Sequence, residues 1–145
     1  MTDLVLVDTN VLLYAHDARD RAKQERARVW MAHLWSSRRG RTSFQVLNEF
    51  YVNATQKLKP GLEPAGAREA VKALLAWEPF TFDARTLEAA WQVQDRYRLS
   101  LWDALIVATA QAGSCRFLLS EDLQHEQDFD GVKVLNPFAV APDAL

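Results

Sequence analysis

The sequence predicts an α/β fold of three layers, α/β/α, in which helices cover both faces of a short, mostly parallel central sheet. Three short apolar runs, at residues 4–7, 116–119 and 132–135, have the length and aliphatic content of buried strands. Longer segments with the spacing of amphipathic helices separate these runs. Strands that alternate with helices are typical of a parallel sheet with helices on both faces. We expect residues 1–145 to form a single domain.

Composition is ordinary for a globular protein, with 49% hydrophobic and 25% charged residues. No apolar run reaches the roughly 18 residues that a membrane helix needs. Residues 1–3 are acidic and lead directly into the first strand, so we expect no secretory leader. The single cysteine, Cys115, excludes an intrachain disulfide. These features together predict a cytoplasmic protein without a membrane segment.

Charge is distributed unevenly along the chain. The net charge is −2, which argues against a protein that coats DNA. Eight of the seventeen basic residues lie within residues 19–41, where only Asp20 and Glu25 oppose them. Residues 83–130, in contrast, are rich in acids. This pattern fits either a polyanion-binding face beside a cation site or a solvated, salt-bridged helix face.

The first half of the chain is predicted to hold helices and one further strand. A short helix over residues 11–16 follows the first strand, and a long helix covers residues 21–37. Gly40 is expected to end the long helix, because glycine is common just after a helix. Residues 41–43 are expected to be extended.

The next helix is expected to begin at Thr42, which forms a capping-box pattern with Gln45. Apolar residues at intervals of three or four predict its buried stripe, formed by Phe44, Leu47, Tyr51, Ala54 and Leu58. Glu49 lies off that stripe, on a face shared with Gln45 and Asn53. The spacing by itself therefore predicts a solvent-facing Glu49.

The second half continues the alternation of helices and strands. A helix is expected over residues 64–77, a short strand over 79–82, and a helix capped by Asp83. After the last strand, Pro137 is expected to begin a loose tail.

Residues 100–112 form the most informative helix. It is apolar almost all round, which predicts that protein surrounds it. Asp103 lies in its first turn, and a carboxylate without partners in an apolar setting costs roughly several kcal/mol. A capping box with Ser100 is one explanation, and a ligand-binding role is another. The two can coexist, because a carboxylate has two oxygens.

Three acids are predicted to converge at one edge of the sheet. Asp8 follows the first strand, and Asp122 follows the strand at residues 116–119. The carboxyl ends of parallel strands share an edge, which the start of the helix bearing Asp103 would also face. Clustered carboxylates repel one another unless a cation compensates, and oxygen ligands suit Mg²⁺ or Mn²⁺. Such a site can hydrolyse phosphodiesters, although Asp8 as a helix cap is the simpler alternative.

Other chemistries fit less well. Cys115 has no histidine near it in sequence, and there is no glycine-rich phosphate loop. A haloacid-dehalogenase-like phosphotransferase with Asp8 as nucleophile is the main rival. That family has a second aspartate two residues further on, where this chain has Asn10. A catalytically silent interaction module is the other alternative.

Several segments carry a resemblance to a known family. They are VDTNVLLYA at 7–15, LNEF at 47–50, LWDALIVATA at 101–110 and LLSEDL at 118–123, with NPF at 136–138. Together they resemble the PIN-domain nucleases, and more closely the VapC-like toxins of bacterial type II toxin–antitoxin pairs. The resemblance covers nearly the whole chain.

The resemblance implies a divalent-metal-dependent endoribonuclease that acts as a toxin. Asp8 and Asp103 would be the metal ligands, for Mg²⁺ or Mn²⁺. The residues that would complete or support the acidic pocket are Glu49, Asp122, Thr9, Asn10 and Ser120. Many relatives have threonine where this chain has Ser120, and the hydroxyl is kept. RNA as substrate, a cognate antitoxin and a homodimer are the implied partners.

Overall fold

A five-stranded sheet forms the centre of the protein. The computed structural model describes residues 3–145, so Met1 and Thr2, on which the expectation of no leader partly rests, lie outside the described residues. The strands are β1 (Val5–Val7), β2 (Gly40–Arg41), β3 (Phe117–Leu119), β4 (Asp128–Phe129) and β5 (Val132–Leu135). Their order is β2-β1-β3-β5-β4, and all pairs are parallel except β4 with β5.

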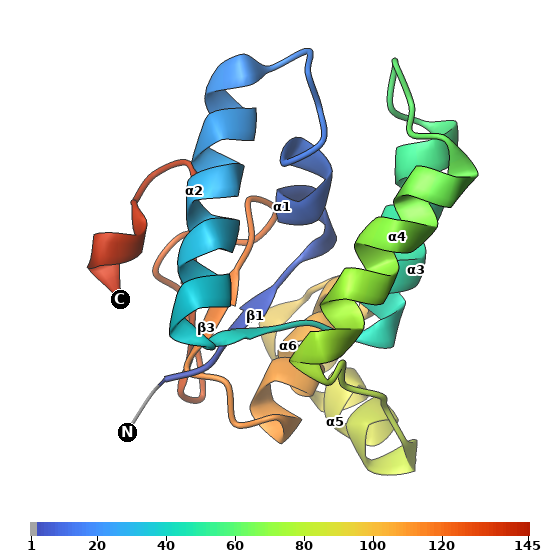
Figure 1. The fold of residues 1–145 in the computed structure, drawn as a ribbon. Coiled ribbons are helices and arrows are strands. Elements are labelled where there is room, and N and C mark those ends of the chain that lie inside the picture. The colour runs from blue at the N-terminus through green and yellow to red at the C-terminus, as the bar shows by residue number, and fades with distance from the viewer. Residues whose placement is uncertain (1–2) are drawn as a thin grey trace.

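Helices cover both faces of this sheet, so the predicted three-layer α/β/α fold is confirmed (Figure 1). They are α1 (Thr9–Tyr14), α2 (Arg21–Ser37), α3 (Phe44–Gln56), α4 (Pro64–Leu74), α5 (Ala84–Tyr97) and α6 (Leu101–Ala112). Two short 3-10 helices, η1 (Leu75–Trp77) and η2 (Pro142–Ala144), complete the elements. Helix α4 packs along α3, and α5 packs along α6. Within residues 3–145, no helix is both long and apolar enough to cross a bilayer.

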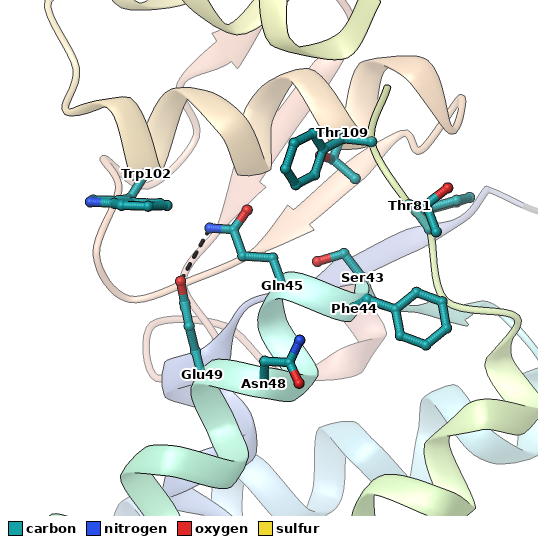
Figure 2. Close-up of a pocket in the computed structure, with 10 residues that line it drawn as sticks. Ser43, Phe44, Gln45, Asn48, Glu49, Thr81, Trp102 and Thr109 are labelled. Atoms are coloured by element: carbon teal, nitrogen blue, oxygen red, sulfur yellow. Dashed lines mark hydrogen bonds between the residues drawn. The ribbon is translucent and has the colours of Figure 1, made fainter. Parts of the chain in front are cut away.

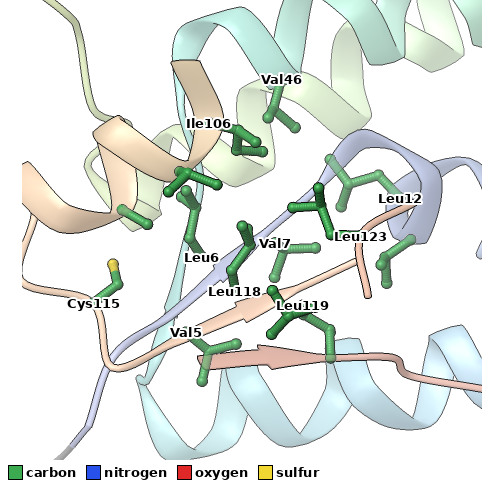
Figure 3. Packing of buried hydrophobic residues seen from close by; sticks show 14 of the residues in the cluster. Val5, Leu6, Val7, Leu12, Val46, Ile106, Cys115, Leu118, Leu119 and Leu123 are labelled. Atoms are coloured by element: carbon green, nitrogen blue, oxygen red, sulfur yellow. The ribbon is translucent and has the colours of Figure 1, made fainter. Parts of the chain in front are cut away.

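The first strand is buried on both faces, as its unbroken apolar sequence predicts. Val5, Leu6 and Val7 are all fully buried. Figure 3 shows Leu6 on the side of α6, near Ile106, whereas Val5 lies on the side of α2. Successive side chains of a strand point to opposite faces, so a strand between two helical layers needs apolar residues at every position. The burial of β1 fixes the position of Asp8, the residue that follows the strand.

Two predicted cap residues around residue 40 are wrong. Helix α2 ends at Ser37 as predicted, but its C-cap is Arg38, whose φ of 59° is left-handed, and Gly40 belongs to β2. A Cβ on Gly40 would lie 2.5 Å from the ring of Trp77, so close packing explains the glycine. The helix cap is Ser43 rather than Thr42, because Ser43 Oγ accepts the Val46 N–H at 3.1 Å. Both errors have one origin, since β2 has two residues and no readable periodicity.

Other expectations hold only in part. The strand predicted at 79–82 is a single bridge between Ser43 and Phe80. Phe44 is 43% exposed and so leaves the predicted buried stripe of α3. Helix α4 ends at Leu74, and the 3-10 turn η1 covers the rest of the predicted helix.

The chain after β5 is held in place, contrary to the predicted loose tail. The indole Nε1 of fully buried Trp30 donates to the carbonyls of Pro137 and Val140, at 3.2 and 3.0 Å. A buried indole N–H needs an acceptor, and α2 offers no free carbonyl in its interior. The tail supplies that acceptor and so packs against α2.

Gly40→Ala should lower the free energy of unfolding by about 1–3 kcal/mol, because the added methyl group must displace the Trp77 ring. Gly66→Ala is the matched control, since a Cβ at Gly66 in α4 meets nothing within 4 Å. The control should raise stability by about 0.5–1 kcal/mol through helix propensity. Urea denaturation measures both, and a Gly40→Ala variant as stable as the parent would contradict the packing argument.

Candidate active site

Asp8 lies at the junction of β1, α1 and β3. Its N–H donates to the Leu119 carbonyl at 3.0 Å, and its Oδ1 accepts the Thr9 N–H at 2.7 Å, so Asp8 does cap α1. The pairing of Val7 with Leu119 brings Ser120 to the same level of the neighbouring strand. Ser120 Oγ donates to Asp8 Oδ2 at 2.8 Å. Capping uses one oxygen of Asp8, and the hydroxyl of Ser120 orients the other.

Asn10 links the first turn of α1 to the loop after β3. Its Nδ2 lies 3.4 Å from Asp8 Oδ2, 3.3 Å from Ser120 Oγ and 3.1 Å from Asp122 Oδ2. Its Oδ1 accepts the Glu121 N–H at 3.2 Å. Asn10 therefore holds Asp8 and Asp122 at a fixed separation. An aspartate at position 10 would add a fifth carboxylate to the acids around this site, where the structure uses a donor.

Glu49 faces α1 rather than open solvent. Thr9 Oγ1 donates to Glu49 Oε2 at 2.8 Å, and Gln45 Nε2 donates to Glu49 Oε1 at 3.1 Å. The carboxylate is half-buried. The solvent-facing interpretation from helical spacing is therefore wrong, because α1 packs on this side of α3.

Asp103 joins the other three acids around one cavity. The cavity has a volume of about 210 Å³, and Asp8, Glu49, Asp103 and Asp122 all line it. The Asp103 N–H donates to Ser100 Oγ at 3.2 Å, which is one of the two bonds of the predicted capping box. Four carboxylates from four separate segments thus share a space at the carboxyl edge of the sheet.

Burial and mutual repulsion set the electrostatics of the cavity. Burial raises the pKa of Asp8 to about 6, although the bonds from Ser120 and Thr9 oppose the rise. Burial also raises the pKa of Asp103, against the bond with Ser100. The charges of Asp122 and Glu49 add to both rises. Two neighbouring carboxylates therefore resist ionisation unless a cation enters the cavity.

The chemistry of the lining fits a hydrated divalent cation. The charged groups of the cavity are carboxylates, the ligands that Mg²⁺ and Mn²⁺ prefer. Across residues 3–145, no three His, Cys, Asp or Glu side chains are grouped closely enough to hold one metal ion together. Mg²⁺ is commonly bound through one or two carboxylates and keeps several waters. Two carboxylates with waters match this cavity better than an all-protein cage.

Sequence reasoning missed three residues that line the cavity. Gln45 and Asn53 stand four residues before and after Glu49, so helical spacing places all three on one face. That polar face could have indicated a site rather than solvent. Trp102 also lines the cavity and is 64% exposed. The apolar composition of α6 had predicted that protein surrounds the whole helix, which is wrong at its first turn.

The basic segment at residues 19–41 does not gather at the cavity. The carbonyl of Arg39 accepts the Val5 N–H at 2.9 Å, beside the start of β1 and thus at the opposite edge of the sheet from Asp8. Lys23 forms an ion pair with Glu121, and Arg28 Nε donates to the Ala15 carbonyl at 2.8 Å. The interpretation as a paired and solvated helix face therefore fits most of this segment.

Comparison with known proteins gives the family. The sequence profile of the PIN domain matches residues 5–129, and the chain therefore belongs to the PIN domain family. The fold is also similar to a chain of a solved toxin–antitoxin complex from Klebsiella pneumoniae, with a TM-score of 0.66. The two chains are 21% identical, over 92% of this chain and 97% of that chain, so the likeness shows a shared fold. No curated protein sequence matches this chain significantly.

Asp8→Asn should stabilise the metal-free protein at pH 7 by about 1–3 kcal/mol, because it removes a charge whose pKa burial raises to about 6. In the native protein, the free energy of unfolding should fall by a similar amount as the pH rises from about 4 to about 6. The reason is that the folded state holds the proton of Asp8 more tightly than the unfolded state does. The variant should lack that slope in urea titrations across this range.

Asp83→Asn is the matched control for this titration. Asp83 also caps a helix, but the Thr86 N–H lowers its pKa, so its loss should destabilise the protein. Equal pH slopes in the native protein and Asp8→Asn would contradict the burial argument.

Proposed function

We propose that this PIN-domain protein is a divalent-metal-dependent endoribonuclease and the toxin of a toxin–antitoxin pair. One observation carries the proposal: carboxylates at positions 8, 49, 103 and 122 line a single cavity at the carboxyl edge of a parallel sheet. Membership of the PIN domain family supports hydrolase chemistry at this cavity. The elevated pKa values of Asp8 and Asp103 support a cation as the missing partner of these acids.

Each acid has a proposed role. Asp8 and Asp103 would hold Mg²⁺ or Mn²⁺, and Glu49 and Asp122 would complete the pocket directly or through water. A cation bound by these residues would supply two kinds of chemistry: it would activate a water molecule and neutralise negative charge on the phosphodiester. Hydrolysis would then join the water oxygen to phosphorus and break the bond to the ribose oxygen, which takes up a proton from solvent as it leaves. Glu49 and Asp122 offer carboxylate oxygens that can accept the proton lost by the water.

The supporting residues keep these oxygens in place. Ser120 and the Thr9 N–H fix both oxygens of Asp8, and the Thr9 hydroxyl fixes one oxygen of Glu49. Asn10 donates to Asp122. Fixed ligands matter because a misplaced catalytic group loses much of its effect. The pattern of donors around the acids supports a preorganised site.

The biological role extends the proposal. The similarity of the fold to a toxin–antitoxin complex supports a small antitoxin protein as the cognate partner. A homodimer, a cytoplasmic location and RNA as substrate are further parts of the proposal. An antitoxin that covers the acidic cavity would control the activity without any change in the toxin itself.

Total RNA incubated with the protein and Mn²⁺ should be cleaved, and EDTA should abolish cleavage. Asp8→Asn and Asp103→Asn should each reduce the rate by about 100-fold or more, because each removes charge that would hold the cation. Gel electrophoresis followed by end-mapping of the fragments measures both the rate and the cut site.

Asp130→Asn is the matched control for these variants, because Asp130 pairs with Arg96 on the surface, outside the lining of the cavity. Its rate should equal that of the native protein. Induced expression of the native protein, but not of Asp103→Asn, should arrest growth. Cleavage that ignores EDTA and both cavity substitutions would refute the proposal, and so would a hydroxylamine-sensitive acyl-phosphate on Asp8.

Mn²⁺ should raise the melting temperature of the native protein, because a ligand that binds only the folded state stabilises it. At a concentration of about 100 times the dissociation constant, the gain is about 2.7 kcal/mol. Differential scanning calorimetry should show a much smaller rise for Asp8→Asn and Asp103→Asn, and an unchanged rise for Asp130→Asn. Equal rises in all four proteins would place the binding of Mn²⁺ elsewhere.

A further inference from the structure

A second cavity, largely aromatic, opens directly beside the acidic one. It has a volume of about 620 Å³ and lies between the start of α3, helix α6 and the segment at residues 80–82. Gln45, Glu49 and Trp102 line both cavities, so the two adjoin. Figure 2 shows Trp102 and Glu49 at one end of this aromatic groove, with Phe44 and Thr81 at the other.

The groove presents flat apolar faces to solvent. Trp102 is 64% exposed, Phe82 52% and Phe44 43%. Large aromatic side chains gain free energy when they are covered, so three of them around one groove indicate a surface that binds something. Amide and hydroxyl groups lie between the rings, including the exposed side chain of Asn48. The groove thus combines stacking surfaces with hydrogen-bonding groups.

Charge limits what the groove can accept. Among the described residues that line it, Glu49 alone is charged, and its charge is negative. A phosphate would be repelled there, whereas an uncharged planar ring with polar edges would be accepted. A nucleobase has this chemistry, and its sugar-phosphate backbone can remain outside the groove.

The position of the groove beside the acidic cavity also favours a nucleobase as the occupant. Trp102 is the residue next to Asp103, so its ring flanks the place where the acids would hold a phosphodiester. The base attached to a neighbouring nucleotide then lies within reach of the Trp102 ring. Bases stack on exposed aromatic side chains only when they are unpaired, because pairing and stacking within a helix cover their faces.

We propose that Trp102 is a stacking platform for an unpaired nucleobase beside the phosphate at the acidic cavity. This inference rests on the proposed ribonuclease function and adds a residue that positions the substrate. The shared lining of the two adjoining cavities, the exposed rings and the absence of positive charge from the described lining carry it. A second copy of this chain is the competing occupant of the groove.

Binding of a short, fluorescently labelled single-stranded oligoribonucleotide in Ca²⁺ tests the proposal, because Ca²⁺ also takes carboxylate ligands and can hold the phosphate at the acidic cavity. Trp102→Ala should weaken binding about 10-fold, within the range known for loss of one base–aromatic stack, and Trp102→Phe should restore most of it. Trp91→Ala is the matched control, because Trp91 is 50% exposed on α5 but does not line the groove. Fluorescence anisotropy should give this variant the affinity of the native protein.

A second series places one abasic nucleotide at each position of the oligonucleotide. At one position, loss of the base should weaken binding to the native protein and leave binding to Trp102→Ala unchanged, which is the coupling expected of a direct contact. The same sequence in a duplex should bind the native protein and Trp102→Ala equally well.

The outcomes separate this inference from the proposed function. RNA cleavage by Mn²⁺-loaded protein, together with equal binding by Trp102→Ala and Trp91→Ala, would overturn the stacking role alone. Base-dependent loss of binding without any cleavage would support the stacking role and refute the nuclease. Light scattering on both proteins resolves the competing occupant: a native dimer that Trp102→Ala converts to a monomer, with no coupling to any base, would overturn the inference. No measurable binding by the native protein would overturn it as well.

Discussion

The hydrogen bond from Ser120 to Asp8 connects the ends of two neighbouring strands and fixes the geometry of the whole cavity. Asp8 is buried, and a buried carboxylate is costly unless donors surround it. The Ser120 hydroxyl and the Thr9 N–H are those donors, and the bond from Ser120 depends on the parallel pairing of β1 with β3. If β1 were shifted by one residue against β3, the side chain of Asp8 would point into the apolar core instead of toward the cavity. The strand pairing that stabilises the sheet therefore also determines the position of the site.

The elements with clear periodicity could be predicted, and those that depend on distant packing could not. Helix α2 has the predicted bounds, and Trp30 and Leu34, four residues apart in sequence, are both buried as the helical spacing predicts. Strand β4, with two residues, has no pattern at all, and its pairing depends on the turn that precedes β5. For the site, the predicted ends of two strands were enough to bring Asp8 and Asp122 to the same cavity. Helical spacing alone misplaced Glu49, because the side of α3 that meets α1 is decided by packing between segments forty residues apart.

The cations nearest the acids have structural partners. Lys23 pairs with Glu121, and its Nζ lies 4.7 Å from the centroid of the Tyr14 ring and 4.9 Å from that of Phe138. This arrangement ties α2 to the loop that carries Asp122 and neutralises one acid next to the cavity. Within residues 3–145, no cationic side chain lines the cavity, so the remaining carboxylates keep their negative potential. Such a field attracts metal ions and requires any bound polyanion to be held by other means.

The four acids are distributed over almost the whole chain, from the end of β1 to the loop after β3. During synthesis on a ribosome, Asp8 emerges early, but Asp103 and Asp122 follow only when most of the polypeptide has been made. Pairing of β1 with β3 also waits for the later segment, so no partial product holds the acidic cavity. During translation, the acidic cavity can therefore assemble only when the chain is nearly complete. The order of residues along the chain delays assembly of the cavity until the protein can fold as a unit.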